Sequence, residues 1–337
     1  MRNENIEINA TSESEQQVPV ENANLLNLNI GSGDNLEKMI DSIKDYARCI
    51  PTGYKDIDNA LQGGIRTGIT IFAAKPNIGK TTMGLQLAEQ FSSFGHQVLY
   101  FCNDMATVEL ISKGISRHSY INDKKNGYSV SEILNVHADS AIKSSEVFKK
   151  ACNSYRENAK NLRIVDSSES LDINNIQKVI ADYLKVGIKP IIFIDYLQKI
   201  VVPGIANDKE KMDYLIVLLK QIALCYSLPI VVISTVNRFS YDKELTLDSL
   251  KESGGLEYNA DVILGLQYEG VGTGDFNIND AKKGAIWNME LVVLKQRLGG
   301  SDIKIPLKFY PKYNLFPYYP LETEKKKGKK TSDYKLF

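Results

Sequence analysis

The chain of 337 residues is 43% hydrophobic and 24% charged, which is the balance of an ordinary globular protein and excludes collagen-like and wholly disordered classes. Its length fits two average domains or one large α/β unit. Forty-one Lys and Arg residues against 41 Asp and Glu residues give no net formal charge. Any nucleic acid must therefore be bound through local basic patches, because there is no global positive field.

Cysteine, histidine and apolar patterns exclude several further classes. The four cysteines are far apart without a C-x-x-C pair, and the three histidines are scattered, which argues against a structural zinc site or a short disulfide framework. The polar amino terminus lacks the apolar core of a secretory signal. The longest apolar runs, such as 190–194 and 229–233, are far too short to cross a bilayer. We therefore expect a cytoplasmic protein with reduced thiols and no membrane contact.

The first 50 residues divide into two segments. Residues 1–34 are rich in Asn, Glu and Ser and follow no helical or alternating period, which predicts a flexible polar arm. Within 35–50, apolar residues recur at helical spacing before the turn at Pro51-Thr52-Gly53, which predicts an amphipathic helix. These apolar residues are Leu36, Met39, Ile40, Ile43 and Tyr46. Their stripe needs a partner, either the chain's own domain or a neighbouring subunit.

Residues 51–318 alternate short β-branched runs with longer amphipathic segments, which is typical of a parallel sheet covered by helices. The predicted strands are 69–74, 97–102, 162–165, 190–195 and 229–234. The predicted helices are 79–94, a helix capped by Asp172 that runs to about 184, and 209–226. These alternations read as βαβ crossovers.

Beyond Asp261 the helical period disappears. Strand-like runs at 261–266, 289–295 and 303–310 are expected to extend the sheet, and the glycine- and Asp-rich loop at 268–283 is expected to be mobile. The last segment, 319–337, contains the basic run EKKKGKK at 324–330, which is either a solvated tail or a tether for a phosphate backbone. The whole pattern predicts an α/β fold with a mainly parallel central sheet, flanked by helices and extended by carboxyl-terminal strands.

One loop between a predicted strand and a predicted helix holds the clearest chemical signal. It reads Ala74-Lys75-Pro76-Asn77-Ile78-Gly79-Lys80-Thr81, with Thr82 next. In a Walker-type loop the glycine lets backbone N–H groups face phosphate oxygens, the lysine neutralises the terminal phosphates, and the hydroxyl ligates Mg²⁺. Ala74 replaces the first glycine of the usual pattern, and a chance Gly-Lys-Thr is the alternative. The flanking strand and helix favour nucleotide binding by these nine residues.

Two carboxylates follow predicted strands. Asp195 ends the apolar run Ile191 to Ile194 and fits the carboxylate that completes a Mg²⁺ site together with Thr81. Asp104, after the second strand, lies where a group that orients the attacking water could sit. Capping of the following segment is the alternative for each, and for Asp104 the capped helix would begin near Thr107.

Lys295 and Arg297 lie two residues apart in a strand-like segment. Residues with this spacing project to one face of a strand, so both could reach the same phosphate. Surface ion pairs are the alternative.

Together these segments resemble the RecA-like motor domain of DnaB-type replicative helicases over residues 50–316. The motifs occur in the family's order: Pro51-Thr52-Gly53 leading to Gly63-Gly64, the Walker loop, Ile194-Asp195-Tyr196-Leu197-Gln198, Asn237-Arg238, Glu252-Ser253-Gly254 with Glu257, Ala260-Asp261-Val262, and Lys295-Gln296-Arg297. In that family the first glycine of the loop is commonly alanine, which accounts for Ala74.

The resemblance implies a RecA-like P-loop ATPase core in a ring, usually of six subunits, that encircles single-stranded DNA and hydrolyses ATP with Mg²⁺ at each subunit interface. Lys80, Thr81 and Asp195 would serve one subunit's nucleotide, while Lys295 and Arg297 match the basic pair that reaches the neighbour's site. It also implies replication partners such as an initiator, a loader or a primase. The basic residues of the two implied DNA-facing loops either contact phosphates or are solvated. They are Lys209, Lys211, Arg238, Lys243 and Lys251.

Three departures from the family pattern bear on function. The amino-terminal domain of full-length members is missing, and the helix within 35–50 resembles the linker helix that docks on an adjacent motor domain, so ring assembly is expected to rest on it. Asp104 replaces the catalytic glutamate, and Thr235 replaces the glutamine that senses the terminal phosphate. Because a displacement of order 1 Å can lower a rate roughly 100-fold, we expect slow hydrolysis.

We therefore predict an ATP-dependent DNA helicase or single-stranded DNA translocase of DnaB type, moving 5′ to 3′ in replication in a bacterial host, encoded by a phage or mobile element given its short form. Asp104 and Thr235 motivate an alternative, a nucleotide-switched ring-forming assembly or helicase-loading factor with weak ATPase activity and no sustained unwinding. A RecA-like recombination ATPase is less favoured, because the Glu252-Ser253-Gly254 and Lys295-Gln296-Arg297 segments are of DnaB type.

Overall fold

The computed structural model describes residues 49–137, 140–166, 171–237, 243–250 and 254–317, together with Leu36 and Ile40. Several predictions fall outside the described residues. These are the arm at 1–34, most of the helix within 35–50, the tail at 319–337, the proposed DNA contacts Arg238 and Lys251, and Glu252 and Ser253 of the family motif.

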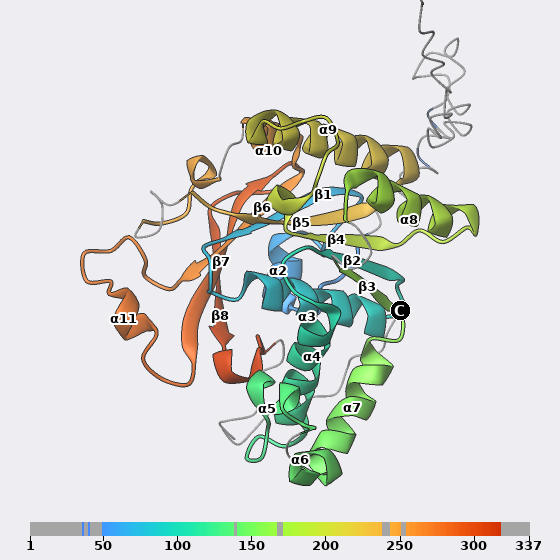
Figure 1. Cartoon of the computed structure of the whole chain (residues 1–337). Helices are drawn as coiled ribbons and strands as arrows, with labels where there is room; N and C mark the ends of the chain where they lie inside the picture. Colours follow the sequence, from blue (N-terminus) through green and yellow to red (C-terminus); the bar gives the residue numbers. More distant parts are fainter. Residues whose placement is uncertain are drawn as a thin grey trace, which may run out of the picture.

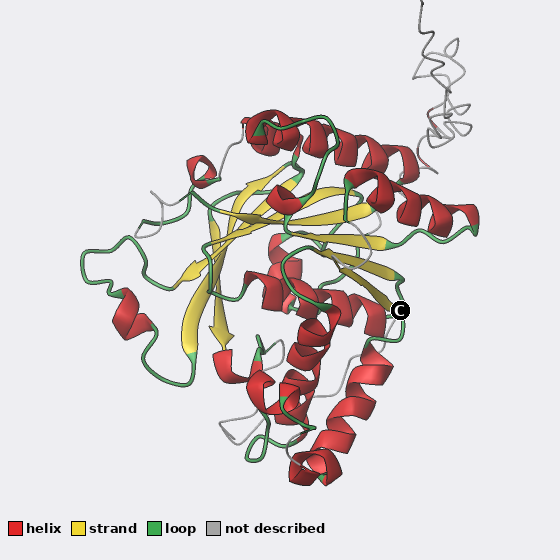
Figure 2. Ribbon diagram, in the orientation of Figure 1, coloured by secondary structure: helices red, strands yellow, loops and turns green. Residues whose placement is uncertain are grey.

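One eight-stranded sheet lies at the centre of the molecule (Figures 1 and 2), with strand order β3-β2-β4-β5-β1-β6-β7-β8. The strands from β3 to β6 in this order are parallel, and β7 and β8 are antiparallel. Their bounds are β1 Gly68–Ala74, β2 Val98–Cys102, β3 Leu162–Asp166, β4 Ile191–Asp195, β5 Pro229–Thr235, β6 Val262–Tyr268, β7 Trp287–Gln296 and β8 Ile303–Phe309. The predicted α/β fold, with its parallel sheet and carboxyl-terminal extension, is confirmed.

Helices cover both faces of the sheet. On one face lie α8 (Ile173–Lys185), α9 (Asp208–Tyr226) and α10 (Gly254–Asn259); on the other lie α2 (Lys55–Ala60), α3 (Lys80–Ser93), α4 (Thr107–Asn122) and α7 (Glu146–Asn158) (Figure 1). Each face has its own buried apolar cluster, because alternate residues of the central strands point to opposite sides. The Asp172 side chain caps α8 as predicted, accepting a hydrogen bond from the Asn175 backbone N–H at 2.9 Å.

The sequence prediction missed most of the helical subdomain between β2 and β3. This region contains α4, α5 (Val130–Leu134), α6 (Ser140–Ser144) and α7. The longest of them, α4, buries polar side chains on its inner face, among them Ser112, Ser116, Arg117 and His118. A helix that buries polar groups has no apolar stripe, so hydrophobic periodicity cannot reveal it.

The loop at 268–283, expected to be mobile, contains the short helix α11 (Ile278–Ala281). The Asn277 side chain caps this helix by accepting hydrogen bonds from the backbone N–H groups of Asn279 and Asp280. Four residues are too few for periodicity to predict a helix.

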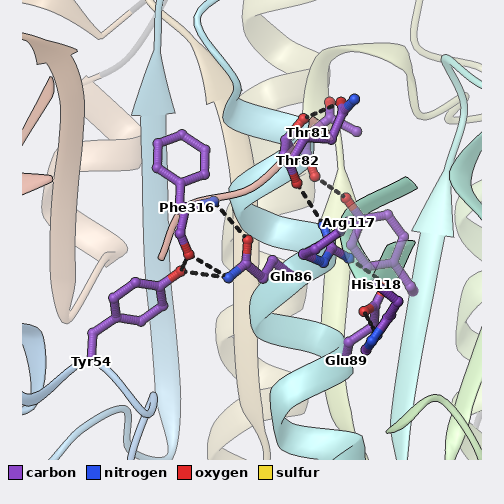
Figure 3. A network of polar contacts seen from close by, with 10 residues as sticks. Tyr54, Thr81, Thr82, Gln86, Glu89, Arg117, His118 and Phe316 are labelled. Carbon is purple, nitrogen blue, oxygen red and sulfur yellow. Dashed lines mark hydrogen bonds and ion pairs between the residues drawn. The ribbon is translucent and has the colours of Figure 1, made fainter. Parts of the chain in front are cut away.

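The segment after β8 returns to the Walker-type loop and packs behind it. The backbone oxygen of Phe316 accepts hydrogen bonds from the Tyr54 hydroxyl at 2.8 Å and from Gln86 Nε2 at 2.6 Å, and its N–H donates to Gln86 Oε1 at 3.0 Å (Figure 3). The Phe316 ring stacks on Phe309 with centroids 4.3 Å apart. A Cβ atom added to Gly79 would come within 2.9 Å of the Phe316 ring. These aromatic rings therefore support the loop from below.

A buried ionic network joins α3, α4 and the same carboxyl-terminal segment. Arg117 pairs with Glu89 and donates to the backbone oxygen of Asn314 at 2.9 Å, while His118 Nε2 lies 3.4 Å from Glu89 (Figure 3). Burial opposes ionisation of Glu89, but the neighbouring Arg117 and His118 outweigh it and lower the pKa of Glu89. The Asn314 side chain in turn accepts from Thr82 Oγ1 at 3.1 Å and from Lys113 at 3.0 Å.

Replacing Phe316 by Ala is expected to lower the free energy of unfolding by roughly 3–5 kcal/mol, the usual range for deletion of a fully buried aromatic side chain. Phe94→Ala is the matched control, because Phe94 directly follows the last residue of α3 and is 50% exposed. Chemical denaturation of both variants measures the difference. Equal losses in the two variants would contradict the supporting role of Phe316.

Candidate functional site

The Walker-type loop connects the buried end of β1 to the first turn of α3. Ala74, Lys75 and Ile78 are buried, whereas Pro76 and Asn77 are exposed. Asn77 has φ +62° and Gly79 has φ +100°, the left-handed region that glycine favours. Gly79 precedes Lys80, the first residue of α3, so the loop and the free N–H groups of the helix start surround one point. This is the geometry of an anion-binding helix terminus.

Polar side chains from the loop and from β2 and β4 converge beside this point. Lys80 is 9% exposed, and its ammonium group lies 4.8 Å from the centre of the Tyr196 ring. Asp195, at the end of β4, is 1% exposed and accepts a hydrogen bond from the Tyr100 hydroxyl at 2.8 Å. The other carboxylate oxygen, Oδ1, is buried without a hydrogen-bond partner among the described residues.

The electrostatics of Asp195 follow from this burial. Desolvation raises its pKa, while Lys80, the Tyr100 hydroxyl and the Thr81 hydroxyl counteract part of the shift. A hydroxyl and a carboxylate are hard oxygen ligands of the kind that Mg²⁺ prefers. The unpartnered Oδ1 beside Thr81 therefore fits the predicted metal site, although no group of three or more His, Cys, Asp or Glu residues forms a metal cluster in the described ranges.

Asp104 lies at the same edge of the sheet, and the alternative that it caps a helix is wrong. The N-cap of α4 is Ala106, and the Thr107 N–H donates to Asp166 Oδ2 at 2.7 Å. The Asp104 carboxylate instead pairs with Lys199 at 2.8 Å, and its side chain is 40% exposed. Asp104 thus keeps a solvent-facing carboxylate next to the loop.

Thr235 ends β5 directly beside the loop. Its Cα pairs in register with that of Ala74 at the end of β1. The preceding residue, Ser234, accepts a hydrogen bond from Gln198 at 3.0 Å, which ties β5 to the segment after Asp195. The structure therefore brings Thr235, Asp195, Asp104 and the loop to one edge of the sheet.

Lys295 and Arg297 lie at the opposite edge. Because β7 is antiparallel to β6, its end pairs with the beginning of β6, and Gln296 faces Val262. The Lys295 ammonium donates to the Glu257 backbone oxygen, and Arg297 Nη2 donates to the Tyr258 backbone oxygen at 3.1 Å. Arg297 also forms the kind of surface ion pair that was the alternative, with Asp261 at 3.3 Å. The seven residues of β1 separate this pair from the loop by about 20 Å.

Of the proposed DNA-contacting lysines that the structure describes, Lys209 is exposed, whereas the Lys211 side chain is only 16% exposed. Lys209 lies in the first turn of α9, within the helix predicted over 209–226, and Lys211 pairs with Asp208 at 2.8 Å on the same helix. Lys243 is exposed. None of the described helices is long and apolar enough to span a membrane.

Three site neighbours escaped the sequence reasoning. Tyr100 donates to Asp195, Tyr196 lies under Lys80, and Lys199 holds Asp104. The alternation of side chains along β2 could have shown which face of the sheet Tyr100 occupies. Nothing in the sequence shows that β4, which carries Asp195, is the neighbouring strand. Lys199 ends the short 3₁₀ turn Leu197–Lys199. The direction of this turn towards Asp104 depends on the packing of the whole fold, which the sequence pattern does not show.

Comparisons with known proteins agree with this geometry. The family model described as DnaB-like helicase C terminal domain matches residues 49–317. The replicative DNA helicase DnaB of Buchnera aphidicola subsp. Baizongia pistaciae is 28% identical over 68% of the chain, and that of Haemophilus influenzae is 26% identical over 79%. The chain spans only about half the length of these relatives, 49% and 54%.

Two solved structures have the same fold. One, described as an ATPase domain, superposes with a TM-score of 0.69 at 23% identity and covers 85% of this chain and 98% of that one. The other, a DnaB-like replicative helicase studied with primase, has a TM-score of 0.67 at 23% identity and covers 85% of this chain and 67% of that one.

Asp195→Asn is expected to stabilise the folded chain at pH 7. Burial raises the pKa of Asp195 in the folded state, so its contribution to stability is highest at low pH and is lost as the pH rises from the unfolded-state pKa through the folded-state pKa. Asparagine does not ionise and escapes this loss, which amounts to about 1.4 kcal/mol per unit of pKa shift.

Denaturant unfolding at pH 7 and at about pH 3, below the usual pKa of Asp, measures the effect. The gain of Asp195→Asn over the unaltered chain should be present at pH 7 and vanish at the lower pH. The exposed Asp104, changed to Asn, is the control and should show no such gain. An Asp195→Asn chain less stable than the unaltered chain at pH 7 would refute the argument.

Proposed function

Because the chain belongs to the DnaB-like helicase C-terminal domain family, we propose that it is an ATP-driven motor on single-stranded DNA that acts in DNA replication. In this proposal it assembles as a ring, of six subunits by analogy with the family, and hydrolyses ATP between neighbouring subunits. Unwinding or translocation then follows from changes at these interfaces. The replicative function is also that named for the relatives described above.

The observation that supports this proposal best is the separation of two half-sites within one chain. The phosphate loop lies at the carboxyl edge of the parallel strands, and Lys295 and Arg297 lie at the other edge. A side chain cannot bridge about 20 Å, so the pair cannot reach the nucleotide of its own chain. Two copies arranged head to tail bring one chain's pair to the other chain's loop, and repetition of this contact closes a ring.

The loop half-site binds the nucleotide in this proposal. Backbone N–H groups of residues 77–80 hold phosphate oxygens, and Lys80 neutralises charge on the terminal phosphates. A Mg²⁺ ion held by Thr81 and Asp195 would supply further neutralisation of the phosphates. Asp104 orients and deprotonates the attacking water, and Thr235 contacts the terminal phosphate.

Arg297 and Lys295 complete the site from the neighbouring chain. Positive charge placed where negative charge develops on the transferring phosphoryl group stabilises the transition state. The Arg297 side chain is 50% exposed, which leaves it accessible to a neighbour. Single-stranded DNA would contact Lys209, Lys211 and Lys243 in this proposal, through charge attraction to its phosphates.

One contact favours a second candidate function, a nucleotide-switched ring or loading factor with weak hydrolysis. Asp104 has a shorter side chain than glutamate and is held by Lys199. Both features oppose activation of water, because the carboxylate is displaced and an ammonium group competes for its lone pairs. Such a protein would bind ATP and assemble without sustained unwinding.

Mixing two inactive variants tests the shared site. Lys80→Ala removes the loop lysine and Arg297→Ala removes the trans cation, so each variant alone should lose ATP hydrolysis by a factor of about 1,000 or more. Mixed rings should regain activity, because some interfaces pair an intact loop from the Arg297→Ala chain with an intact Arg297 from the Lys80→Ala chain. Steady-state ATPase assays across mixing ratios measure this recovery.

Nucleotide binding by the Arg297→Ala variant is the control and should stay close to that of the unaltered chain. A loss of binding in that variant, or mixtures with no more activity than their components, would contradict hydrolysis at the subunit interface.

Asp104→Glu distinguishes the motor from the switch. A glutamate reaches one methylene further towards the nucleotide, and a gain of about tenfold in ATP turnover is expected if the aspartate limits hydrolysis. Asp104→Asn keeps the size but lacks the base and should reduce turnover. The assay is run with and without single-stranded DNA. Brisk DNA-stimulated turnover in the unaltered chain with no gain in Asp104→Glu would eliminate the switch.

A further inference from the structure

Asp261 occupies a fixed position at the start of β1. Its backbone N–H donates to the Ile69 oxygen at 2.9 Å, and one carboxylate oxygen accepts from the Ile69 N–H at 2.8 Å. A Cβ atom added to Gly68 would lie 2.2 Å from the same carboxylate oxygen. The absence of a side chain at Gly68 therefore lets the carboxylate lie directly against the strand.

This carboxylate contacts two cations from different elements. Lys220, on α9, donates to both of its oxygens at 2.7 and 2.5 Å, and Arg297 Nε lies 3.3 Å from Oδ1. The backbone N–H of Arg297 also donates to the Asp261 backbone oxygen at 3.0 Å. The Asp261 side chain is only 21% exposed, so these interactions are partly shielded from water.

The contacts define the orientation of the Arg297 guanidinium. Nε faces Asp261 and Nη2 donates to the Tyr258 oxygen at 3.1 Å. A guanidinium has five N–H donors in a rigid plane, so a group held at one edge can present other donors to a phosphate. A cavity of about 150 Å³, lined by Arg297, Leu298 and Leu61 among others, lies beside the guanidinium. Without the carboxylate, the side chain has space to rotate away.

We propose that Asp261 is a positioning residue for phosphoryl transfer in the neighbouring subunit, because it fixes the guanidinium of Arg297 in the direction that the neighbour's triphosphate requires. This inference rests on the proposed function, in which Arg297 acts across the interface. Asp261 itself touches no nucleotide, since it lies at the edge of the sheet opposite its own phosphate loop. It acts on the neighbour's nucleotide only through Arg297.

Asp261→Asn tests the proposal, because asparagine retains an oxygen for the Ile69 N–H and loses the charge that holds Arg297. The expected result is a fall of roughly tenfold or more in kcat for ATP hydrolysis, with KM for Mg-ATP unchanged within about twofold, since a misplacement of about 1 Å can reduce a rate by up to 100-fold. In the Arg297→Ala background the same change should have no further effect, as expected for two residues that act as one unit.

Mixed rings show whether the defect acts in trans. The Asp261→Asn chain has an intact loop, and the Lys80→Ala chain has an intact Asp261 and Arg297, so mixtures should regain hydrolysis. Arg297→Ala mixed with Lys80→Ala is measured in parallel. Recovery in that control without recovery for Asp261→Asn would overturn the positioning role alone. Failure of both mixtures would instead refute hydrolysis across the interface.

Lys220→Met is the matched structural control. It removes the other partner of Asp261 and leaves Arg297 paired, so its kcat should stay within about twofold of the unaltered chain. The control also keeps the proposal testable if Asp261→Asn does not fold. A tenfold loss of kcat in a folded Lys220→Met chain would show that the packing of α9 on Asp261, and not the orientation of Arg297, controls the rate.

Discussion

The polarity of the parallel sheet is the constraint on which the rest of the structure depends. Strands β1 to β6 all end at one edge, so the loop after β1 meets the polar residue that follows β2 and those that end β4 and β5. Ligands of open α/β sheets bind at this edge for the same reason. The reversed strand β7 brings its own end to the other edge and separates Arg297 from the loop. One reversal of strand direction thus places the two halves of the proposed site at opposite edges of the sheet.

Packing behind the loop stabilises it against the cost of burying charged groups beside it. Asp195 and Lys80 are buried polar groups, and burial of a carboxylate opposes folding unless partners compensate. The Tyr100 hydroxyl provides one partner from β2. Apolar contacts provide the rest of the support, because the stacked rings of Phe309 and Phe316 close the space beneath Gly79. The carboxyl-terminal segment, distant in sequence, therefore belongs to the structure that supports the phosphate loop.

The sequence predicted those parts of the molecule that depend on local periodicity and motif. All eight strands lie within two residues of their predicted bounds, and the loop from Ala74 to Thr81 joins a strand to a helix as expected. The contacts of Asp104 with Lys199 and of Arg297 with Asp261 could not be predicted, because each joins segments whose relative position is set by strand order. Helix α4 was expected only as a helix that begins near Thr107, and its length escaped for a different reason, since its buried face is largely polar and is satisfied by Glu89 and Asn314.

Strand β1 runs from the Asp261–Arg297 pair at one end to the phosphate loop at the other. Its first residues hold Asp261 and, through it, Arg297, and its last residue leads into the phosphate loop. All seven residues of β1 are buried, and the strand pairs with β5 on one side and β6 on the other. A buried strand hydrogen-bonded on both sides resists local opening, so it holds its two ends at a fixed separation. In the proposed head-to-tail ring, each chain would therefore present Arg297 to its neighbour at a set distance from its own phosphate loop.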